Sequence, residues 1–383
     1  MSARWDRGGP GPGDGVPLVL HVIPTATARG AQREARALAT RLDAPGTRHH
    51  RLLSLFAGPR QVPVDIALDH PGGDRAAQGF DPRLVIGLRA LLRRTGPSVV
   101  VAHGGDPLKY LVPATLGSRR PLAYYATGTF EHASSPARVA LWRWLMGRAD
   151  VVAAEGHEVL EQCRQLLHVP ERRSVLAPNG RDPAEFYPPQ RRIDPREPVL
   201  AFVGAFSPGK RPGRFVEVVR ELRKDDVALR AFMCGDGALV SEVAGPAAAA
   251  GVELLGSRSD VAAVLREADV FVFPSLPTGE GMPGVLIEAG MSGLPVVATA
   301  VPGVRTIVED GTSGFVVDVD DLDSMVQVTK RLLVMPGLRR AMGDAGRKRC
   351  EQRFSLDAVA ACWLSFLEPL VARSARRTRR AAG

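Results

Sequence analysis

The chain has 383 residues, of which 45% are apolar and 24% charged, and its formal net charge is +9. This length predicts two domains, and the composition is that of a folded globular protein rather than a disordered one. No uninterrupted apolar run approaches the ~20 residues that a membrane-spanning helix needs. Residues 1–15 lack the apolar segment of a secretory signal, so we expect a flexible tail there.

The four cysteines lie far apart and form no C-x-x-C pair. They are Cys163, Cys234, Cys350 and Cys362. Their spacing argues against a disulfide framework and against a cysteine-based metal site. A reducing cytoplasm is therefore the expected compartment.

The C-terminal end is strongly basic. After Glu368 the chain has no acidic residue and five arginines, at positions 373, 376, 377, 379 and 380. We expect residues 373–383 to be a disordered tail, which either is simply solvated or is attracted to an anionic membrane surface. Nucleic acid is not an expected partner, because no aromatic interleaving or recognised nucleic-acid motif accompanies these arginines.

The first half of the chain, residues 16–190, alternates between short apolar strands and amphipathic helices. The expected strands are 16–23, 51–56, 99–102, 122–126, 151–154 and 174–177, and the expected helices are 31–42, 82–94, 107–116, 136–146 and 157–167. This alternation predicts a parallel sheet with helices on both faces. Ligands of such sheets bind beyond the carboxyl ends of the strands.

Candidate lining residues follow three of these strands. Thr25 to Gly30 follows the first strand and can either cradle a phosphate or hydroxyl or form a plain turn. His103 follows the strand 99–102, and His132 lies in the loop after 122–126. A lone histidine is more often structural or exposed than catalytic, so both interpretations of His103 and His132 stay open.

A second α/β series begins after a proline-rich stretch, 188–198, which we expect to be the interdomain linker. The expected strands are 199–203, 229–234, 252–255 and 314–317, together with the two strands within 271–297. The expected helices are 212–223, 238–250, 261–268, 322–334 and 336–354. Residues 199–354 thus form a second doubly wound domain, and a cleft between the two domains is the default ligand site. A last amphipathic helix, 355–372, places Trp363 and Phe366 on its apolar face.

The most informative stretch is 271–297, a strand, a Gly/Pro-rich loop, a short helix and a second strand. Glu280 lies in the loop and Glu288 in the helix, with seven residues between them. A helix that starts at a proline and exposes free N–H groups is a common anion site. Lys210, in the loop after the strand 199–203, is well placed to meet phosphate oxygens. The local chemistry therefore predicts a phosphate-binding crevice with a carboxylate on each side.

These features occur in the order found in a known family. The ordered set covers about residues 16–370 and resembles the retaining glycosyltransferases of the GT-B fold, in the large family-4 group. The matching pieces are Pro178-Asn-Gly180 with Phe186 and Pro188, Val203-Gly204 with Lys210, Cys234-Gly-Asp-Gly237, Gly256, Ala268-Asp-Val270 with Phe273-Pro-Ser275, Glu280-Gly281 with Glu288-Ala289, Gly293-x-Pro295-Val296, and Asp310-Gly311 with Gly314.

The resemblance implies two Rossmann-like domains facing a cleft and transfer of a sugar, with retention, from a UDP- or GDP-linked donor to a hydroxyl. Glu288 is then expected to bind the ribose, Glu280 the sugar hydroxyls, and Lys210 the diphosphate. The implied catalytic residues are Glu280, Lys210 and His103. The implied donor-binding residues are Gly204, Lys210, Arg211, Gly256, Arg258, Glu280, Gly281, Met282, Pro283, Gly284, Val285, Leu286 and Glu288, and the acceptor-side residues are Arg29, Gly30, His103, Thr127 and Gly128.

The resemblance also implies that no cofactor or metal is needed, since Lys210 and helix N–H groups can stabilise the leaving diphosphate. The expected acceptor is a glycan, a glycolipid or a small-molecule glycoside. The expected location is the cytoplasm, with peripheral contact on the inner face of the membrane as the alternative that the basic end suggests.

Two positions depart from the family pattern. Ala205 stands where the family usually has an arginine that contacts the diphosphate, so Arg211 or Lys210 would have to replace that charge. Thr127-Gly128 stands where the family often has His-Gly. Two alternatives therefore stay open at this point: a binding protein that keeps the nucleotide site without the chemistry, and an enzyme that acts on the nucleotide sugar itself, such as an epimerase.

Overall fold

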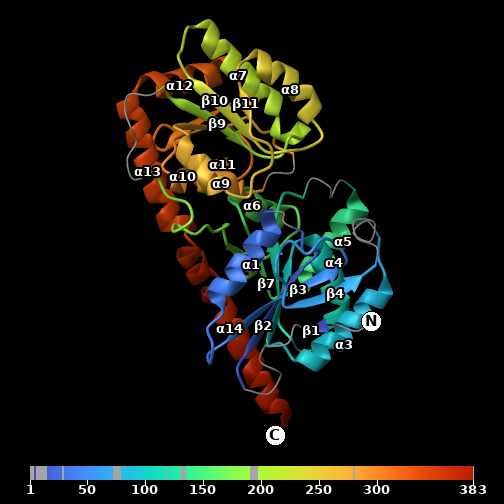
Figure 1. The fold of residues 1–383 in the computed structure, drawn as a ribbon. Coiled ribbons are helices and arrows are strands. Elements are labelled where there is room, and N and C mark those ends of the chain that lie inside the picture. The colour runs from blue at the N-terminus through green and yellow to red at the C-terminus, as the bar shows by residue number, and fades with distance from the viewer. Residues whose placement is uncertain are drawn as a thin grey trace. The chain divides into compact units, whose positions relative to one another are not determined.

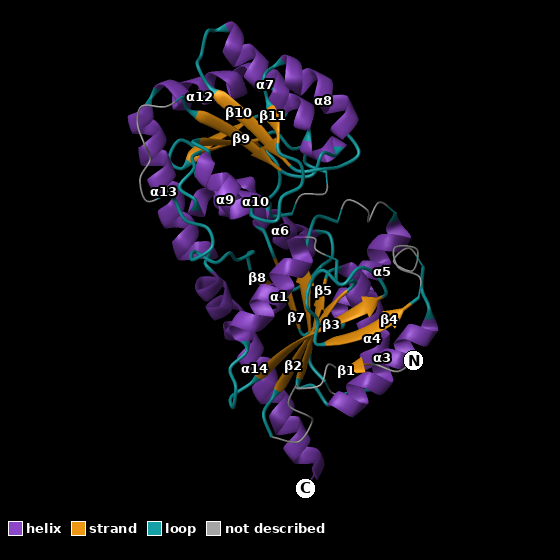
Figure 2. Cartoon of the chain, in the orientation of Figure 1, coloured by secondary structure: helices purple, strands orange, loops and turns teal. Residues whose placement is uncertain are grey.

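The structure is a computed structural model that describes residues 4–5, 15–27, 30–71, 79–118, 120–130, 135–189, 197–278 and 281–382. The chain divides into two compact units. The first joins Met1–Asn179 to Leu356–Gly383, and the second is Gly180–Ser355. In each unit a twisted sheet lies between layers of helices (Figures 1 and 2). The predicted fold class, two Rossmann-like domains, is confirmed.

In the described part of the first unit, the sheet has eight strands in the order β1-β4-β3-β2-β5-β6-β7-β8. They are β1 (Arg4–Trp5), β2 (Leu18–Ile23), β3 (His49–Phe56), β4 (Ile66–His70), β5 (Val99–His103), β6 (Leu122–Ala126), β7 (Val151–Ala154) and β8 (Ser174–Leu176). All pairs are parallel except β1 with β4. The helices are α1 (Gly30–Leu42), α3 (Pro82–Thr95), α4 (Gly105–Thr115), α5 (Pro136–Gly147), α6 (His157–Gln165), η1 (Glu171–Arg173) and α14 (Leu356–Ala382).

The two faces of the first sheet are covered by different helices because successive strand residues point to opposite sides. Leu20 and Val22 of β2 pack with the apolar residues of α3, α4, α5 and α6. Val19 of β2, with Val99 and Val101 of β5, packs against α1 and the C-terminal helix α14. The first unit is therefore completed by a helix from the far end of the chain.

The sheet of the second unit has, within the described residues, six parallel strands in the order β11-β10-β9-β12-β13-β14. The strands are β9 (Val199–Val203), β10 (Arg230–Cys234), β11 (Glu253–Leu254), β12 (Val270–Phe273), β13 (Val296–Thr299) and β14 (Gly314–Val317). The helices are η2 (Pro208–Lys210), α7 (Pro212–Lys224), α8 (Val240–Ala249), α9 (Val261–Glu267), α10 (Gly284–Met291), α11 (Val304–Ile307), α12 (Leu322–Val334) and α13 (Pro336–Phe354).

In both sheets successive strands are first added toward one edge and then toward the other, and this order reverses between two neighbouring parallel strands, β2 and β5 in the first unit and β9 and β12 in the second. At such a topological switch point the loops that follow the two strands diverge, which leaves a crevice at their carboxyl ends. The sheet order therefore directs attention to the loops after these four strands.

The chain passes between the units at a different place from the predicted linker. The second unit begins at Gly180. Phe186 is only 5% exposed and packs into the core of the second unit, which explains why residues 180–189 belong there. Residues 190–196 of the predicted linker 188–198 lie outside the described ranges.

The C-terminal end also differs from the sequence prediction. Helix α14 continues to Ala382, through the segment 373–382 that we expected to be disordered. Alanine and arginine are strong helix formers, and Arg373 forms an ion pair with Asp150 at 2.6 Å, so the helix extends beyond its packed part.

The segment Leu356–Arg377 of this helix is long and apolar enough, by length and composition, to cross a membrane. Its apolar side chains include Trp363, Phe366 and Leu367, which are buried in the first unit. Packing on the sheet accounts for these buried side chains, and Trp363 and Phe366 take the packing role that their amphipathic spacing predicts.

Candidate functional site

The candidate donor site lies at the switch point of the second sheet. The loop after β9 leads through Gly204 to Lys210, and the loop after β12 leads to α10. The two loops touch, because the N–H of Leu276 donates to the carbonyl of Gly209 at 2.7 Å. The Lys210 ammonium lies 5.0 Å from the centre of the Phe273 ring, at the end of β12. The structure thus brings Lys210 to the base of the predicted donor loop.

Glycines allow the close approach of these loops. A Cβ on Gly235, after β10, would lie 1.9 Å from the carbonyl oxygen of Gly204, so only glycine fits there. Gly303 has a φ of +78°, and a Cβ on it would lie 2.3 Å from the carbonyl oxygen of Gly281. Gly256 also has a positive φ, +65°, and its carbonyl accepts from the N–H of Gly235. The donor loop is consequently supported by backbone on both sides.

The start of α10 has the properties of an anion site. Pro283 is the N-cap residue and has neither an N–H nor a capping side chain. Met282 is 5% exposed and anchors the loop in the core, while the N–H of Leu286 is bonded to the Pro283 carbonyl. Within the described residues, the N–H groups of Gly284 and Val285 have no hydrogen-bond partner. Two donors therefore stand at the positive end of the helix dipole.

Glu288 lies on α10 one turn after these N–H groups, and its side chain is 17% exposed. Its Oε1 atom accepts a hydrogen bond of 2.7 Å from Nε of Arg181, whose side chain is 16% exposed. A half-buried carboxylate needs such a partner, because desolvation of an unpaired charge is costly. Arg181 was not among the predicted site residues, although it directly follows the Pro178-Asn-Gly180 motif.

Two predicted donor cations are held by other groups. Nη1 of Arg211 donates to the carbonyl of Val319 at 2.7 Å and lies 3.2 Å from a carboxylate oxygen of Asp320. Arg258 makes two bonds to the Asp260 carboxylate, at 2.8 and 2.6 Å, and this bond lowers the pKa of Asp260 to about 2. These contacts hold both guanidinium groups at Val319, Asp320 and Asp260 rather than at the start of α10.

Some predicted residues lie outside the described ranges, and their predictions stand untested. They are Glu280 in the donor loop, Arg29 on the acceptor side, and His132.

The predicted acceptor side contains His103, which the structure places inside the core of the first unit. His103 is the last residue of β5 and is 5% exposed. Its ring stacks on Trp363 of α14 with an interplanar angle of 7°, and its Nε2 is 2.9 Å from Nδ1 of His21. This placement differs from the expectation that His103 lines the acceptor site, because a helix more than 250 residues downstream covers it.

His103 ends a chain of three hydrogen-bonded imidazoles. Nε2 of His21 is 2.9 Å from Nδ1 of His50, so His21 bonds to a histidine on each side. Burial lowers the pKa of His103 to about 3 and that of His50 to about 4, and burial with the neighbouring imidazoles holds the pKa of His21 well below its usual value. All three rings are therefore neutral at pH 7 and act as hydrogen-bonding core residues.

The other acceptor-side residues lie at the switch point of the first sheet. Gly30 begins α1, after β2, and is exposed. Thr127 and Gly128 follow β6, and Oγ1 of Thr127 lies close to Gly104, the residue after β5. Gly128 has a φ of +81°, and its N–H donates to Oε1 of Glu155 at 2.5 Å. The loops after β2, β5 and β6 are thus neighbours, as their strand order predicts.

A polar network supports the Gly128 loop. Glu155 is 7% exposed and accepts a second bond, at 3.3 Å, from Nδ2 of Asn179. Oδ1 of Asn179 accepts a bond of 2.9 Å from the Tyr125 hydroxyl. The sequence did not predict this network, because Asn-Gly is a common turn dipeptide and Asn179-Gly180 was interpreted as a turn.

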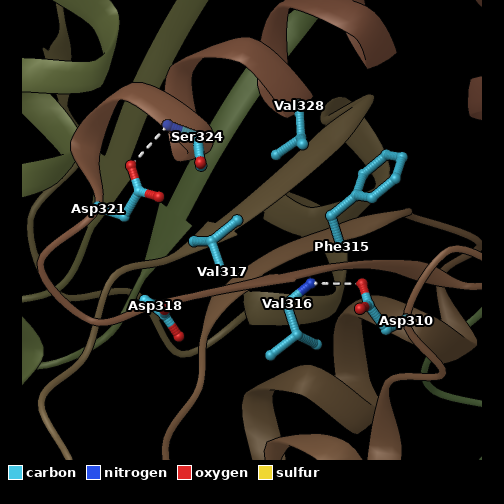
Figure 3. Close-up of a pocket in the computed structure, with 8 residues that line it drawn as sticks. All are labelled: Asp310, Phe315, Val316, Val317, Asp318, Asp321, Ser324 and Val328. Atoms are coloured by element: carbon cyan, nitrogen blue, oxygen red, sulfur yellow. Dashed lines mark hydrogen bonds between the residues drawn. The ribbon is translucent and has the colours of Figure 1, made fainter.

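A separate pocket lies over β14 and the start of α12, with a cavity volume of about 300 Å³ (Figure 3). Two of its carboxylates accept backbone hydrogen bonds: Oδ1 of Asp310 accepts from the N–H of Val316, and Oδ1 of Asp321 accepts from the N–H of Ser324, both at 2.9 Å. The pocket contains none of the predicted donor residues. Among the residues that could be searched for metal ligands, the described ones, no group of three His, Cys, Asp or Glu side chains is arranged to hold an ion.

The fold and the loop at α10 define a two-domain glycosyltransferase of the GT-B type. The sequence profile of Glycosyltransferase Family 4 matches residues 28–185, and that of Glycosyl transferases group 1 matches residues 197–334. The two matches lie in successive halves of the chain and together cover most of it. The chain belongs to the group 1 glycosyltransferases, and it is an enzyme of that class.

Curated relatives are similar along large parts of the chain. The UDP-Gal:alpha-D-GlcNAc-diphosphoundecaprenol alpha-1,3-galactosyltransferase of Escherichia coli is 26% identical over 66% of this chain and 70% of its own length. A D-inositol 3-phosphate glycosyltransferase of Actinosynnema mirum is 27% identical over 87% of both chains. The same-named protein of Geodermatophilus obscurus is 30% identical, but the match spans only 57% of its length.

Solved structures share the fold. Sucrose-phosphate synthase from Thermosynechococcus elongatus superposes with a TM-score of 0.80 at 18% identity, over 93% of this chain and 100% of that one. Anabaena HepE in complex with UDP and glucose gives a TM-score of 0.76 at 18% identity, over 92% of this chain and 100% of that one. At this identity the likeness concerns the fold.

Proposed function

We propose that this glycosyltransferase uses a UDP- or GDP-linked sugar as its donor and transfers the sugar to a hydroxyl with retention at the anomeric carbon. The observation that carries the proposal is the arrangement at the start of α10. The N–H groups of Gly284 and Val285, which have no partner among the described residues, stand beside the Glu288 carboxylate at the switch point of the sheet. An anionic diphosphate and a ribose with two hydroxyls are complementary to these groups.

In this proposal Glu288 accepts the ribose hydroxyls, and Lys210 with the α10 N–H groups binds the diphosphate. Breaking the bond to the anomeric carbon leaves additional negative charge on the diphosphate oxygens. Donors that are already in place stabilise this charge without reorganisation, so this chain's own groups supply the electrostatic part of catalysis without a cofactor. Glu280 is proposed to bind the sugar hydroxyls, as the family resemblance implies.

For the acceptor we propose either a sugar carried on a lipid diphosphate or a small polar molecule that has a free hydroxyl. The names of two relatives support these classes, since one acts on a diphosphoundecaprenol-linked sugar and the other on an inositol phosphate. The acceptor would approach the loops of the first unit at Gly30, Thr127 and Gly128, with Arg29 beside them. His103, which is neutral and bonded to His21, would support the loop after β5 from below.

A cytoplasmic location with peripheral contact to an anionic membrane is proposed with the lipid-linked acceptor. Helix α5 supports it, because Leu141 is 51% exposed and Trp144 is 44% exposed on one side of the helix. Exposed arginines at 138, 143 and 148 flank them, and residues 136–148 include no acid. Exposed aromatic and basic residues together are typical of helices that lie at a lipid surface. The arginines at the end of α14 add to the positive charge.

A donor panel tests the main proposal. Binding and thermal stability are measured with UDP, GDP and a set of their sugar conjugates, and turnover is followed as release of nucleoside diphosphate. We expect one nucleotide series to stabilise the protein and one sugar to support release with an acceptor. The anomeric configuration of the product, read by NMR, must match that of the donor. Absence of binding to every UDP and GDP compound would exclude the proposed donor class.

Vesicle sedimentation tests the membrane contact. The full chain is expected to co-sediment with vesicles that contain phosphatidylglycerol and to remain in solution with pure phosphatidylcholine. Leu141→Gln with Trp144→Gln should reduce this binding, whereas Ile86→Gln, at a 70% exposed apolar residue of α3, should not. Equal binding by all three proteins would exclude α5 as the contact.

A further inference from the structure

Arg181 stands at the start of α10, between the Glu288 carboxylate and the first turn of the helix. Its Nε donates to Glu288 at 2.7 Å, and its Nη1 donates to the carbonyl of Gly180 at 2.8 Å. Its Nη2 lies so close to Gly284 that a Cβ on that glycine would be 2.0 Å away. We propose that Arg181 is a donor-binding residue that provides a cation for the nucleoside diphosphate and orients the carboxylate for the ribose. This inference rests on the proposed donor class.

The backbone of Arg181 is fixed as firmly as its side chain. Its N–H donates to the carbonyl of Phe354 at 2.8 Å, and Arg181 forms a parallel bridge with Ser355. A guanidinium whose Nε and Nη1 are already bonded loses little further conformational entropy when a ligand binds. Gly284 completes this arrangement, because any side chain at that position would displace the guanidinium from the helix.

The positive charge of Arg181 can balance diphosphate charge that the predicted cations of the site do not reach. Ala205 is exposed and offers no charge after the Gly204 turn. The guanidinium of Arg211 is bonded at Val319, and that of Arg258 at Asp260. Lys210 lies on the β9 side of the switch point, and Arg181 lies on the α10 side. A diphosphate carries at least two negative charges, so a second cation beside the N–H groups of Gly284 and Val285 matches its charge and can pair with two of its oxygens.

The two parts of the role can be measured separately. If Arg181 contacts the diphosphate, its substitution should weaken binding of the nucleoside diphosphate more than binding of the nucleoside. If Arg181 only supports Glu288, its substitution should weaken the binding of both ligands equally. The experiment therefore determines dissociation constants for uridine, UMP and UDP, and for guanosine, GMP and GDP, with the wild-type chain, Arg181→Gln and Arg181→Lys. The series whose diphosphate binds the wild type more tightly is used for the comparison.

We expect Arg181→Gln to lower the ratio of diphosphate to nucleoside affinity by about 10-fold or more, which is the usual effect of one charge-assisted hydrogen bond. Arg181→Lys should retain part of the preference for diphosphate over nucleoside, because it keeps the positive charge. It should weaken binding of the nucleoside, because an ammonium is a poor substitute for the bidentate guanidinium. A ratio in Arg181→Gln equal to that of the wild type would overturn the inference.

A matched control and a rescue make the result specific. Arg347 bonds through Nε to Oε1 of Glu351 at 2.7 Å, on α13 of the same unit, so Arg347→Gln breaks the same kind of pair away from α10. It should leave the ratio unchanged. Adding Ala205→Arg to Arg181→Gln should restore the diphosphate preference by returning a cation to the crevice. No rescue, together with a drop in stability of Arg181→Gln beyond that of Arg347→Gln, would indicate a structural role and reject the proposal.

The outcomes also separate this inference from the proposed function. If the wild type binds neither UDP nor GDP, the donor class itself is wrong. If the wild type binds one of them and the ratio does not respond to Arg181→Gln, only the role of Arg181 is wrong.

Discussion

The two switch points of this enzyme use polar residues in opposite ways. In the first unit, His21, His50 and His103 bond to one another beneath α14, and burial keeps all three neutral. In the second unit, Glu288 and Arg181 form an ion pair and are partly exposed beside the start of α10. The three histidines of the first unit are thus buried in the core, whereas the Glu288–Arg181 pair of the second unit lies at the carboxyl end of the sheet.

This difference shows that position after a strand does not by itself make a residue part of a site. His103 ends β5 next to the switch point, but Trp363 stacks on its ring and excludes it from solvent. Glu288 lies on a short helix whose first turn keeps Gly284 and Val285 partly exposed. The covering element, rather than the residue type, decides which polar groups can meet a ligand.

The largest expected effect is a loss of stability in acid, which would come from the first unit. The unfolded chain takes up protons on His21, His50 and His103 below about pH 6.5. In the folded chain burial lowers the pKa of His50 to about 4 and that of His103 to about 3, and holds the pKa of His21 well below its usual value. Because the unfolded state binds more protons in this window, the free energy of unfolding falls as the pH is lowered, by about 1.4 kcal/mol per pH unit for each histidine. Urea titrations at pH 7.5, 6 and 5 measure this slope.

Among the three histidines, only His50 has charged side chains other than histidine that shift its pKa. Arg48 and Arg51 lower the pKa of His50 further, and Asp43 opposes them. His50→Gln should therefore remove about a third of the slope. A free energy of unfolding that stays constant between pH 7.5 and 5 would mean that the three histidines are not a buried neutral chain.

Next in size is the effect of Trp363→Ala, which removes the cover of the first switch point. Trp363 is 1% exposed and contacts the rings of His21, His103, Tyr125 and Phe366. We expect a loss of about 3–5 kcal/mol in the free energy of unfolding, the range for truncating a buried aromatic residue. Chemical denaturation measures it, and a loss below 1 kcal/mol would show that α14 covers this face without supporting it.

In the second unit the corresponding change, Glu288→Gln, should affect binding more than folding. The substitution keeps the shape of the side chain and removes the charge that pairs with Arg181 and accepts ribose hydroxyls. We expect nucleotide affinity to fall by about 1–3 kcal/mol. Calorimetric titration with UDP and GDP checks this, with melting curves as the control for folding. Unchanged affinity would mean that the carboxylate does not contact the nucleotide.

The smallest expected effect is that of Asn179→Ala, in the network below the Gly128 loop. The change leaves the Tyr125 hydroxyl and one Glu155 oxygen without their present partner. We expect a loss of about 1–2 kcal/mol in stability, with donor binding preserved because the network belongs to the first unit. If donor affinity falls as much as stability, the separation of the two switch points proposed here does not hold.

Much of this molecule could be predicted from its sequence because the relevant signals are local. The β-α alternation predicted both sheets, and the Gly/Pro-rich loop with Glu288 predicted the helix start that the structure places at the switch point. Arg181 and the partner of His103 were not predictable in this way. Both depend on contacts between residues about 100 or more positions apart, Arg181 with Glu288 and His103 with Trp363, and no local pattern encodes such contacts.

The end of α14 was mispredicted for a related reason. A run of arginines and alanines can be a disordered tail or a helix, and the choice depends on whether the preceding helix is anchored. Here Trp363 and Leu367 anchor it, and the helix continues through Arg373. The anchoring lies in the tertiary structure, which local propensity does not contain.

The pairing of Arg181 with Phe354 and Ser355 has a consequence for how the protein can be divided. Because these contacts join residues at the beginning and the end of the second unit, Gly180–Ser355 is an uninterrupted segment whose two ends meet. Such a segment is suited to expression on its own, or to transplantation into another host at a single loop. The first unit is instead assembled from both ends of the chain. A stop codon before residue 356 would therefore leave the second unit intact and remove helix α14 from the first unit, although most of the first unit is encoded at the other end of the gene.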